Sequence, residues 1–300
     1  MDSPPSPIVK PRKRKVLQLL LKIAITILCF WYITTKINFT NSLKALMGAN
    51  WWFLGLAVLL YALSKLLSSF RLNIYFRNMQ LFIKEGENIN LYWLGMFYNL
   101  FLPGAIGGDA YKVIILNKKR NSPLKLTSTA ILLDRFSGLL ALSVILSFFG
   151  LLVLKNSWLT LLLTGGSLVS IGLFYLLVHL LFTRFLKSFL PTFFWGVLVQ
   201  ATQVVCVYCI LMSLGEPLQP EWIFIFLLAS IVSVFPISMG GGLGTRELVF
   251  AEGAHYFNLN AELGVTISLL FFLCNFLSCI PAVYFIFNEP LSTQLEIMEN

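Results

Sequence analysis

Long apolar runs, separated by short polar connections, form the main pattern of this chain. The runs are about 20 residues long, which is the length a helix needs to cross the hydrocarbon core of a membrane. They do not alternate apolar with polar residues, as half-buried strands would. The pattern predicts about six full spans, at 16–35, 51–70, 126–153, 158–182, 192–214 and 263–287.

Two further apolar stretches, 89–117 and 222–257, are broken near their middles by Pro and Gly. Basic connections lie on both sides of the first stretch, so it must leave and return to the same face of the membrane. Non-basic connections flank the second stretch, which places both of its ends on the opposite face. The sequence therefore predicts two re-entrant hairpins that enter from opposite sides.

Lys and Arg are concentrated in a subset of the connections, which predicts the orientation of the chain. Connections rich in basic residues stay in the cytoplasm. Only Lys36, Lys44 and Lys155 then lie outside, and both termini are predicted to be cytoplasmic. The predicted cytoplasmic residues are Lys10, Arg12, Lys13, Arg14, Lys15, Arg71, Arg77, Lys84, Lys112, Lys118, Lys119, Arg120, Lys125, Arg184 and Lys187.

Composition narrows the fold class to a polytopic, all-α transmembrane helical bundle. Hydrophobic residues make up 58% of the 300 and charged residues only 12%, and the mean hydropathy is +0.82. These values exclude a soluble fold, and the helix-length runs exclude a closed barrel. The predicted organisation is a basic cytoplasmic tail at 1–15, one transmembrane domain at 16–288 with halves at 16–153 and 158–287, and a short tail at 289–300.

Several classes of partner are not expected. The net charge of +9 is a topology signal in such a chain and does not indicate nucleic acid. The five cysteines lie inside apolar runs, where they behave as small hydrophobes. The two histidines lack metal-ligand spacing, and the chain contains no nucleotide-binding loop or nucleophile motif. We therefore expect no cofactor, no metal site and no catalytic residue.

The first break runs from Asn99 through Pro103 to Gly107, Gly108, Asp109 and Lys112. Pro cannot continue the helical hydrogen bonds and Gly permits a turn. Asp109 stands where it would cap a returning helix at 110–117. One interpretation gives Asp109 this capping role alone. The other exposes free N–H groups and a positive dipole end to a polar cavity that suits an anionic head group.

The second break repeats this arrangement with Gly241, Gly242 and Gly244 before Arg246 and Glu247. Thr245 or Gly244 would cap a helix that continues to about residue 257. Adjacent charged residues point about 100° apart on a helix, so Arg246 and Glu247 should each find another partner. Both breaks contain the spacing Pro-x-x-x-Gly-Gly. This spacing suggests an inverted repeat, in which broken segments mark the site of a transporter.

Polar residues also occur inside spans. Asp134 and Arg135 lie about 15 Å deep if the helix begins near Lys125, since each residue adds about 1.5 Å. They are either functional or a structural pair with Asp109 or Glu247. Gln200 and Gln203 could hydrogen-bond another helix or line a pathway. Lys22 and Lys65 are interpreted as side chains that reach the cytoplasmic interface, without a function.

Three motifs in order carry a family resemblance: Asn99…Leu102-Pro103-Gly104…Gly107-Gly108-Asp109…Lys112, then Asp134-Arg135 with Gly138, then Pro236…Gly241-Gly242-Leu243-Gly244-Thr245-Arg246-Glu247. They resemble the transmembrane, flippase-like region of lysylphosphatidylglycerol synthases and their stand-alone relatives. The position of Lys112 is often Arg in that family. The soluble aminoacyl-transferring domain of the full synthases has no counterpart after residue 288, so we expect no lipid aminoacylation by this chain and no enzyme activity.

The resemblance implies movement of a polar-headed lipid, phosphate-bearing or linked to a glycan, between leaflets of a bacterial plasma (inner) membrane. One alternative is a membrane subunit or regulator that supports lipid or glycan synthesis and transports nothing. Another is a membrane-embedded transferase with Asp109 or Glu247 as base. Expected partners are membrane lipids and a lipid-modifying or glycosyltransferase enzyme, and oligomerisation stays open. The predicted substrate-binding residues are Asn99, Gly107, Gly108, Asp109, Lys112, Asp134, Arg135, Gly241, Gly242, Gly244, Arg246 and Glu247.

Overall fold

The computed structural model describes residues 47–101, 107–234, 242–287 and 291, and the regular elements in these ranges are all helices. They are α3 (Trp51–Asn78), α4 (Glu85–Phe101), α5 (Gly107–Arg120), α6 (Leu124–Val153), α7 (Ser157–Leu181), η1 (Thr183–Ser188), α8 (Phe189–Ser213), α9 (Pro220–Val234), α10 (Thr245–Tyr256), α11 (Ala261–Cys279), η2 (Ile280–Val283) and α12 (Tyr284–Phe287). The predicted span at 16–35, the tail at 1–15 and most of 289–300 lie outside the described residues. Pro103, Gly104, Pro236, Gly240 and Gly241 at the breaks also lie outside them.

Five helical segments are long and apolar enough to cross a membrane, and they confirm the five predicted spans that the structure describes. Their bounds are Trp51–Asn78, Leu124–Val153, Ser157–Leu181, Thr183–Ser213 and Ala261–Val283. Most ends agree with the prediction within a few residues. The exceptions are α3, which continues well beyond residue 70, and the segment Thr183–Ser213, which begins nine residues earlier than predicted because a 3₁₀ turn precedes α8.

Asparagine side chains cap the first turns of three helices at the same end of the bundle. Asn50 accepts a hydrogen bond from the backbone of Trp52, and Asn156 accepts one from Trp158. Asn260 accepts from the first turn of α11 in the same way. These carbonyl oxygens satisfy N–H groups that have no partner within the helix. The caps explain why α3, α7 and α11 begin where they do.

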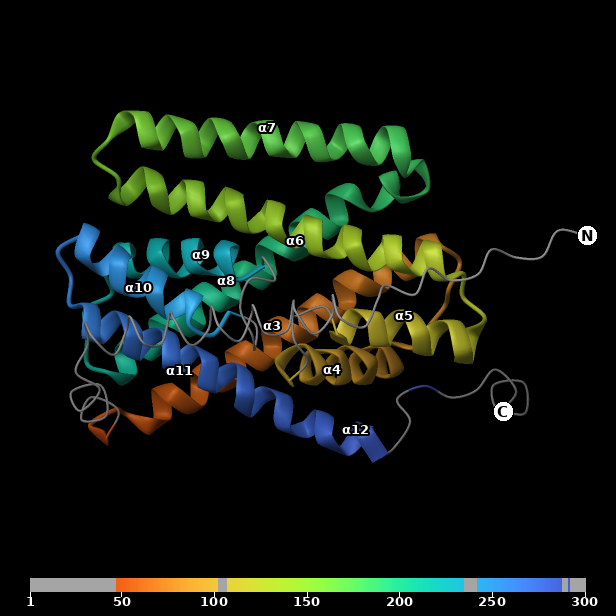
Figure 1. Ribbon diagram of the computed structural model, residues 1–300, viewed down its shortest axis with the longest axis horizontal. Helices are drawn as coiled ribbons and strands as arrows, with labels where there is room; N and C mark the ends of the chain where they lie inside the picture. Colours follow the sequence, from red (N-terminus) through yellow and green to blue (C-terminus); the bar gives the residue numbers. More distant parts are fainter. Residues whose placement is uncertain (1–46, 102–106, 235–241, 288–290, 292–300) are drawn as a thin grey trace, which may run out of the picture.

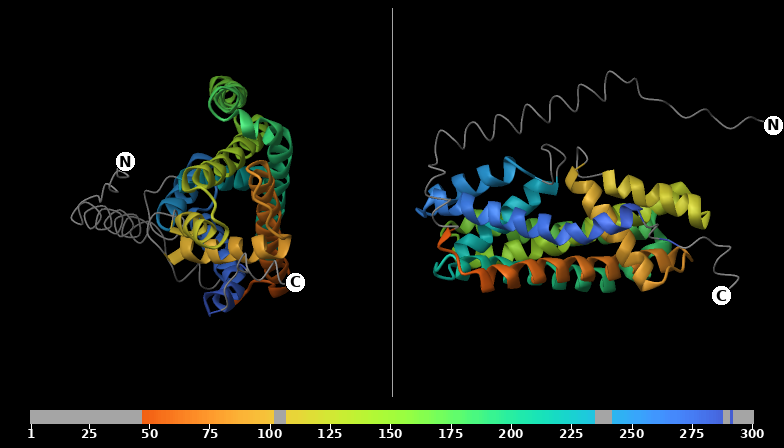
Figure 2. Two further views of the ribbon diagram at one scale, coloured as in Figure 1. Left: turned by 90° about the vertical axis from the view of Figure 1, so that its right-hand side faces the viewer. Right: turned by 90° about the horizontal axis from the view of Figure 1, so that it is seen from below.

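The two broken stretches form helical hairpins that enter the bundle from opposite ends. α4 packs against α5, and α9 packs against α10. Figure 2 shows α4 and α5 at one end and α9 and α10 at the other, with their broken ends directed toward the middle. This is the arrangement expected for opposed hairpins. The inverted repeat stays a prediction, because the span that would begin its first half lies outside the described residues.

Three long helices, α3, α6 and α8, pack closely along the bundle (Figure 1). The backbone N–H of Asn50 donates to the carbonyl of Ser213 over 2.7 Å at one end of the α3–α8 contact. Near the other end, the Tyr75 and Thr192 hydroxyls lie 2.9 Å apart. A Cβ at Gly196 of α8 would lie only 2.9 Å from the Cβ of Ala141 on α6. We call these three helices the frame.

A polar layer separates the two large clusters of the apolar core. α3 contributes Leu54 and Tyr61 to one cluster and Phe76 to the other. The residues buried between them on α3 are polar, and they include Ser68 and Arg71. The buried residues of α6 follow the same order, with Leu133 in one apolar cluster, Asp134 in the polar layer and Leu142 in the other cluster. The polar layer therefore lies near the middle of the long helices.

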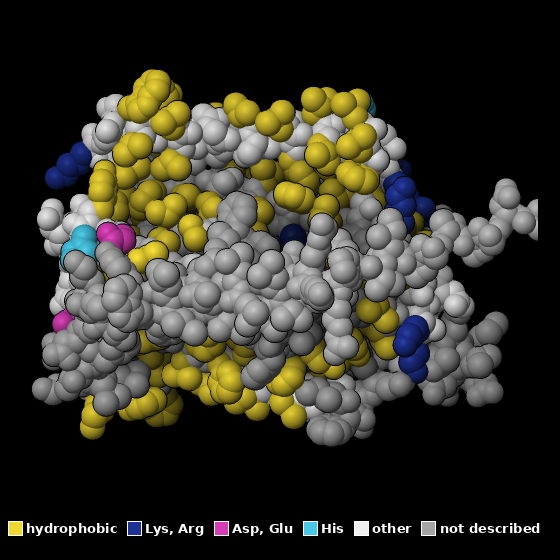
Figure 3. Space-filling model, in the orientation of Figure 1, with side chains coloured by type: hydrophobic (Ala, Val, Ile, Leu, Met, Phe, Trp, Pro, Cys, Tyr) yellow, Lys and Arg dark blue, Asp and Glu magenta, His cyan; other side chains and the backbone are white. Residues whose placement is uncertain are grey.

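The two ends of the bundle differ in charge, as the positive-inside pattern predicts. In Figure 3 most Lys and Arg side chains lie at the end formed by α5 and the start of α6. The Asp and Glu side chains visible in this view lie at the opposite end, together with a His, and hydrophobic side chains cover much of the surface between. The large exposed hydrophobic side chains include Trp52, Leu168, Leu180 and Phe194. Such a surface suits contact with lipid.

Candidate functional site

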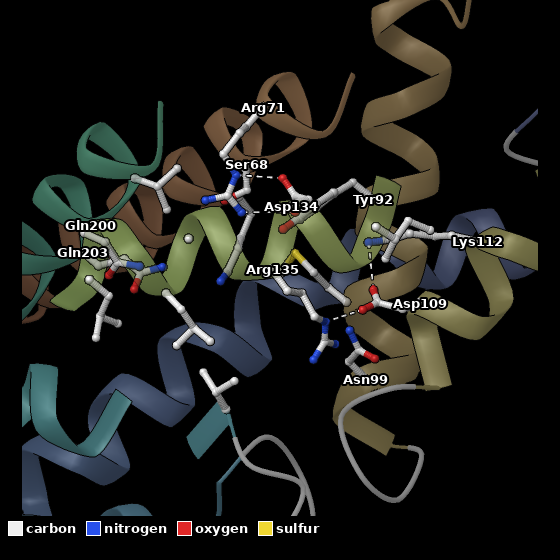
Figure 4. A pocket seen from close by; sticks show the side chains of 18 residues that line it. Ser68, Arg71, Tyr92, Asn99, Asp109, Lys112, Asp134, Arg135, Gln200 and Gln203 are labelled. Atoms are coloured by element: carbon white, nitrogen blue, oxygen red, sulfur yellow. Dashed lines mark hydrogen bonds and ion pairs between the residues drawn. The ribbon is translucent and has the colours of Figure 1, made fainter. Parts of the chain in front are cut away.

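The polar layer contains a cavity of about 240 Å³ (Figure 4). It is bordered by the three frame helices and both hairpins, because Val234 at the end of α9 lies in its wall together with residues of α4 and α5. We call it the central cavity. Its lining residues are Lys65, Ser68, Arg71, Tyr92, Met96, Asn99, Asp109, Lys112, Ile131, Asp134, Arg135, Gly138, Leu139, Leu142, Val199, Gln200, Gln203 and Val234.

A buried, bidentate ion pair joins α3 to α6 at this level. The Arg71 Nε and Nη2 atoms donate to the two carboxylate oxygens of Asp134 over 2.7 and 3.1 Å. The side chains are only 6% and 8% exposed. Gly138, one turn after Asp134, leaves the space for the guanidinium, because a Cβ there would lie 2.8 Å from Arg71 Nη1. Paired charges with this geometry are retained where either alone would be costly to bury.

A second ionic group joins α5 to α6. Asp109 accepts from Lys112, whose Nζ lies 3.3 Å from Oδ1, and from the Nε of Arg135. Lys112 Nζ also lies 4.1 Å from the centre of the Tyr92 ring. Figure 4 shows Asp134 and Arg135, which are consecutive on α6, directed to opposite sides, the first to α3 and the second to α5. The predicted structural pair of Arg135 with Asp109 is therefore present.

The start of α5 differs from the prediction that Asp109 is its N-cap. The helix already begins at Gly107, so Asp109 lies within its first turn. The end of α4 supplies a partner for this turn instead, because Asn99 Oδ1 accepts from the Gly108 N–H over 2.8 Å. Gly108 also lies so close to Gly95 of α4 that a Cβ there would overlap the carbonyl of Gly95. The sequence pattern missed this contact because Asn99 and Gly95 lie on the preceding helix.

Lys65 is the basic residue of the central cavity that has no carboxylate within salt-bridge distance among the described residues. Its Nζ lies 4.7 Å from the centre of the Tyr61 ring. The helix α3 extends to Asn78, so Lys65 lies near its middle and not close to an interface. The interpretation of Lys65 as a side chain that reaches the interface was therefore wrong. Its placement depended on an α3 that ended at residue 70.

Arg71 was also placed incorrectly by the sequence. It was assigned to a cytoplasmic connection, but it lies within α3 and is 5% exposed. The spacing of Ser64, Ser68 and Arg71 on α3 is the signal that could have identified this polar face, because residues four and three apart lie on one side of a helix. Gln200 and Gln203 line the cavity, and Gln203 also donates to the Ser64 hydroxyl of α3 over 3.3 Å.

The central cavity carries an excess of positive charge. Its lining contains four basic side chains, Lys65, Arg71, Lys112 and Arg135, and two carboxylates, Asp109 and Asp134. With all of them ionised, the difference is a formal charge of +2. Buried charge without a protein counter-ion is costly, so the cavity favours an anionic ligand over an uncharged one.

The second break places its charges differently from the first. Glu247 is 1% exposed and accepts from the Gly244 N–H over 2.6 Å and from the Ser268 hydroxyl over 2.9 Å. Gly244, with φ of 86°, caps α10 as predicted, and Gly242 has φ of 112°. Both glycines therefore have the backbone conformation that favours Gly.

Arg246 rests on aromatic rings. Its Cζ lies 4.1 Å from the ring centre of Phe271 and 5.4 Å from that of Phe226. Its Nε and Nη2 atoms are buried without a hydrogen-bond partner among the described residues. Tyr61, which contacts Lys65, packs edge-on against the same Phe271 at 5.1 Å. The Lys65 and Arg246 cations thus contact one aromatic cluster. Arg246 and Glu247 each have a partner other than the other, as predicted.

The structure brings together some of the predicted site residues and separates others. Asn99, Asp109, Lys112, Asp134 and Arg135 line the central cavity. Gly107 and Gly108 shape the adjoining start of α5. Gly242, Gly244, Arg246 and Glu247 form the start of α10, outside the cavity lining, while Gly241 lies outside the described residues. No group of three or more His, Cys, Asp or Glu that could hold a metal ion occurs in the part of the chain that the structure describes.

Comparison with known proteins yields one family. Residues 19–191 and 182–282 match the model of the lysylphosphatidylglycerol synthase TM region. A UPF0104 membrane protein of Pyrococcus horikoshii is 27% identical over 106 residues, which is 35% of this chain and 30% of that protein. The aligned part is therefore less than a third of the relative's length.

Proposed function

The chain belongs to the family of lysylphosphatidylglycerol synthase transmembrane regions, and from this membership we propose that it moves a phosphate-bearing lipid or lipid-linked glycan between the leaflets of a membrane. It is a multi-pass membrane protein. The proposed location is the plasma (inner) membrane of a bacterium, with the basic end of the bundle and both termini in the cytoplasm.

The central cavity is the observation that carries this proposal. It lies between two apolar clusters, about halfway along helices that are long enough to cross a membrane. A lipid head group must pass this level when it changes leaflet, and its passage costs less if polar and charged groups replace water there. The cationic excess matches a phosphate group.

The basic residues of the cavity have separate roles in this proposal. Lys65 binds the phosphate directly, since no carboxylate of the described residues lies within salt-bridge distance of it. Arg135 exchanges Asp109 for the phosphate as the ligand enters, which its 33% exposed side chain permits. Arg71 stays with Asp134, because this pair is less exposed and closer to ideal geometry. Head-group binding thus competes with the α5–α6 ion pair and loosens one hairpin.

The test is lipid exchange by the purified full-length chain in liposomes. Phosphatidylglycerol and phosphatidic acid with a fluorescent head or chain are placed in both leaflets, and dithionite bleaches the outer one. We expect bleaching of more than the outer half when the protein is present. Arg135→Ala should slow the exchange, and Arg135→Lys should restore part of it. Arg77→Ala is the matched control, because Arg77 forms an exposed ion pair with Glu85 away from the cavity.

Other outcomes favour the rival functions. No exchange of any lipid from the source membrane, with folded protein, would overturn transport and favour a subunit that supports a lipid-modifying or glycosyltransferase enzyme. Formation of a modified lipid by the purified chain from an added donor would favour a transferase. Unchanged exchange in the Arg135→Ala variant would contradict the assigned site.

A further inference from the structure

A second, apolar recess lies beside the central cavity, where α6, α7 and α9 meet. Its volume is about 270 Å³. Two serines in its wall present no free hydroxyl hydrogen, because Ser143 donates to the carbonyl of Leu140 and Ser170 to that of Ser167. We call it the side groove. It is lined by Phe136, Leu139, Leu140, Ser143, Ser170, Phe174 and Ile231.

The side groove lies at the periphery of the bundle. Figures 1 and 2 show α7 standing at the outer edge, beside α6. Only Ser167 and Val178 of α7 are buried, and the helix packs mainly on α6 and η1. In Figure 3 the face between α7 and the middle of the bundle is hollowed and hydrophobic, and a basic side chain is visible within it. Among the described residues, the groove is therefore open at the periphery of the bundle, where lipid would surround the protein.

The side groove and the central cavity lie on adjoining faces of α6 and meet at Leu139. Leu139 lines both. Arg135 lines the cavity, and the next residue, Phe136, lines the groove, one helical turn before Leu139. The Phe136 ring lies 6.2 Å from that of Phe174 on α7, so an aromatic pair closes one side of the groove. A charged recess thus adjoins an apolar one over a single turn.

We propose that the side groove binds one acyl chain of the lipid whose phosphate-bearing head group enters the central cavity. This arrangement matches an amphiphile, because the Arg135 cation lies where the central cavity meets the side groove and the apolar lining of the groove lies beyond it. The head group then enters sideways, between α6 and α9, while the chain stays under α7. This site relies on the proposed function for its head group, but chain binding does not require that the lipid cross the membrane.

The test is photo-crosslinking of the full chain in phosphatidylcholine nanodiscs. The probe is phosphatidic acid with a diazirine in the middle of one acyl chain, and crosslinked peptides are identified by mass spectrometry. We expect label on the segments of α6, α7 and α9 that line the groove. Unlabelled phosphatidic acid should compete for this label, whereas diacylglycerol should not, because it lacks the phosphate.

Variants that fill the groove with a larger side chain test whether the label depends on the groove. Ser170→Trp should reduce the competable label by at least about tenfold, the effect of removing contacts to two or three methylenes. Val169→Trp is the matched control, because residue 169 is 60% exposed and points elsewhere on α7. Ile231→Trp fills the groove from α9 and keeps the test valid if Ser170→Trp fails to fold.

Two results would overturn the proposal that the side groove binds an acyl chain. One is label spread over the whole lipid-facing surface without competition, and the other is equal label in the Ser170→Trp, Ile231→Trp and Val169→Trp variants. Failure of transport is distinguishable from both. A protein without leaflet exchange that still gives competable groove label would overturn the proposed function and keep the chain site.

Discussion

The Arg71–Asp134 pair lies in the interior, so the loss of one partner leaves the other charge unpaired there. We predict that Asp134→Asn lowers the free energy of unfolding by about 3–5 kcal/mol. The matched control is Glu85→Gln, which breaks a pair whose side chains are 57% and 42% exposed and should cost less than about 1 kcal/mol. Thermal unfolding in detergent measures both. Equal shifts in melting temperature would contradict the structural role of the buried pair.

Lys65 tests the proposed anion site without breaking an ion pair. Lys65→Met should slow the exchange of phosphatidic acid by about tenfold to a hundredfold, because it removes a charge-assisted contact worth about 1.5–3 kcal/mol. Lys65→Arg should keep most of the exchange. Lys118→Met is the control, since Lys118 is exposed on α5 away from the cavity. Wild-type exchange by the Lys65→Met variant would exclude Lys65 from phosphate binding.

At the residue scale, the sequence identified the charged residues of the cavity better than it identified their ion-pair partners. Asp109, Asp134 and Arg135 stood out because charge is rare in apolar runs, and all three line the cavity. The partners depended on distances between helices. Arg71 lies 63 residues from Asp134 in sequence, and no periodicity within one helix reports such a contact.

Among the elements, the α4–α5 hairpin depends on a close approach of two glycines. Gly108→Ala should separate the helices and lower stability by about 1–3 kcal/mol, the usual cost of overpacking. Gly86→Ala is the matched control, because a Cβ at Gly86 meets no atom within 4 Å. It should be neutral or slightly stabilising, as Ala favours a helix. Melting temperatures of the two variants are compared, and equal stability would show that the contact is not required.

Element types and breaks were predictable because apolar length and Gly or Pro positions are local signals. The residues at which the helices end were less predictable. The sequence RLNIYFRN after residue 70 is polar enough to suggest a connection, but α3 continues through it. Tertiary packing of Leu72, Tyr75 and Phe76 in the second apolar cluster explains the extension. This error at one helix end also misplaced Lys65 and Arg71.

On the scale of the whole molecule, the opposed hairpins and the charge asymmetry predict which loops face which side. Single cysteines at Lys118 or Lys187 should react with an impermeant maleimide only from the cytoplasm. Cysteines at Lys155 or Glu216 should react only from outside. The assay uses a background in which the native cysteines are replaced. Labelling of all four positions from one side would contradict the topology.

The frame has a mechanical consequence. Hydrogen bonds join α3 to α8 near both ends of their contact, and the bidentate Arg71–Asp134 pair joins α3 to α6 near the middle of the bundle. A frame joined in this way resists shear, so we expect the movements of the proposed transport to occur in the short, broken helices that pack against it. The long spans would then keep their positions, and the two hairpins would move relative to them.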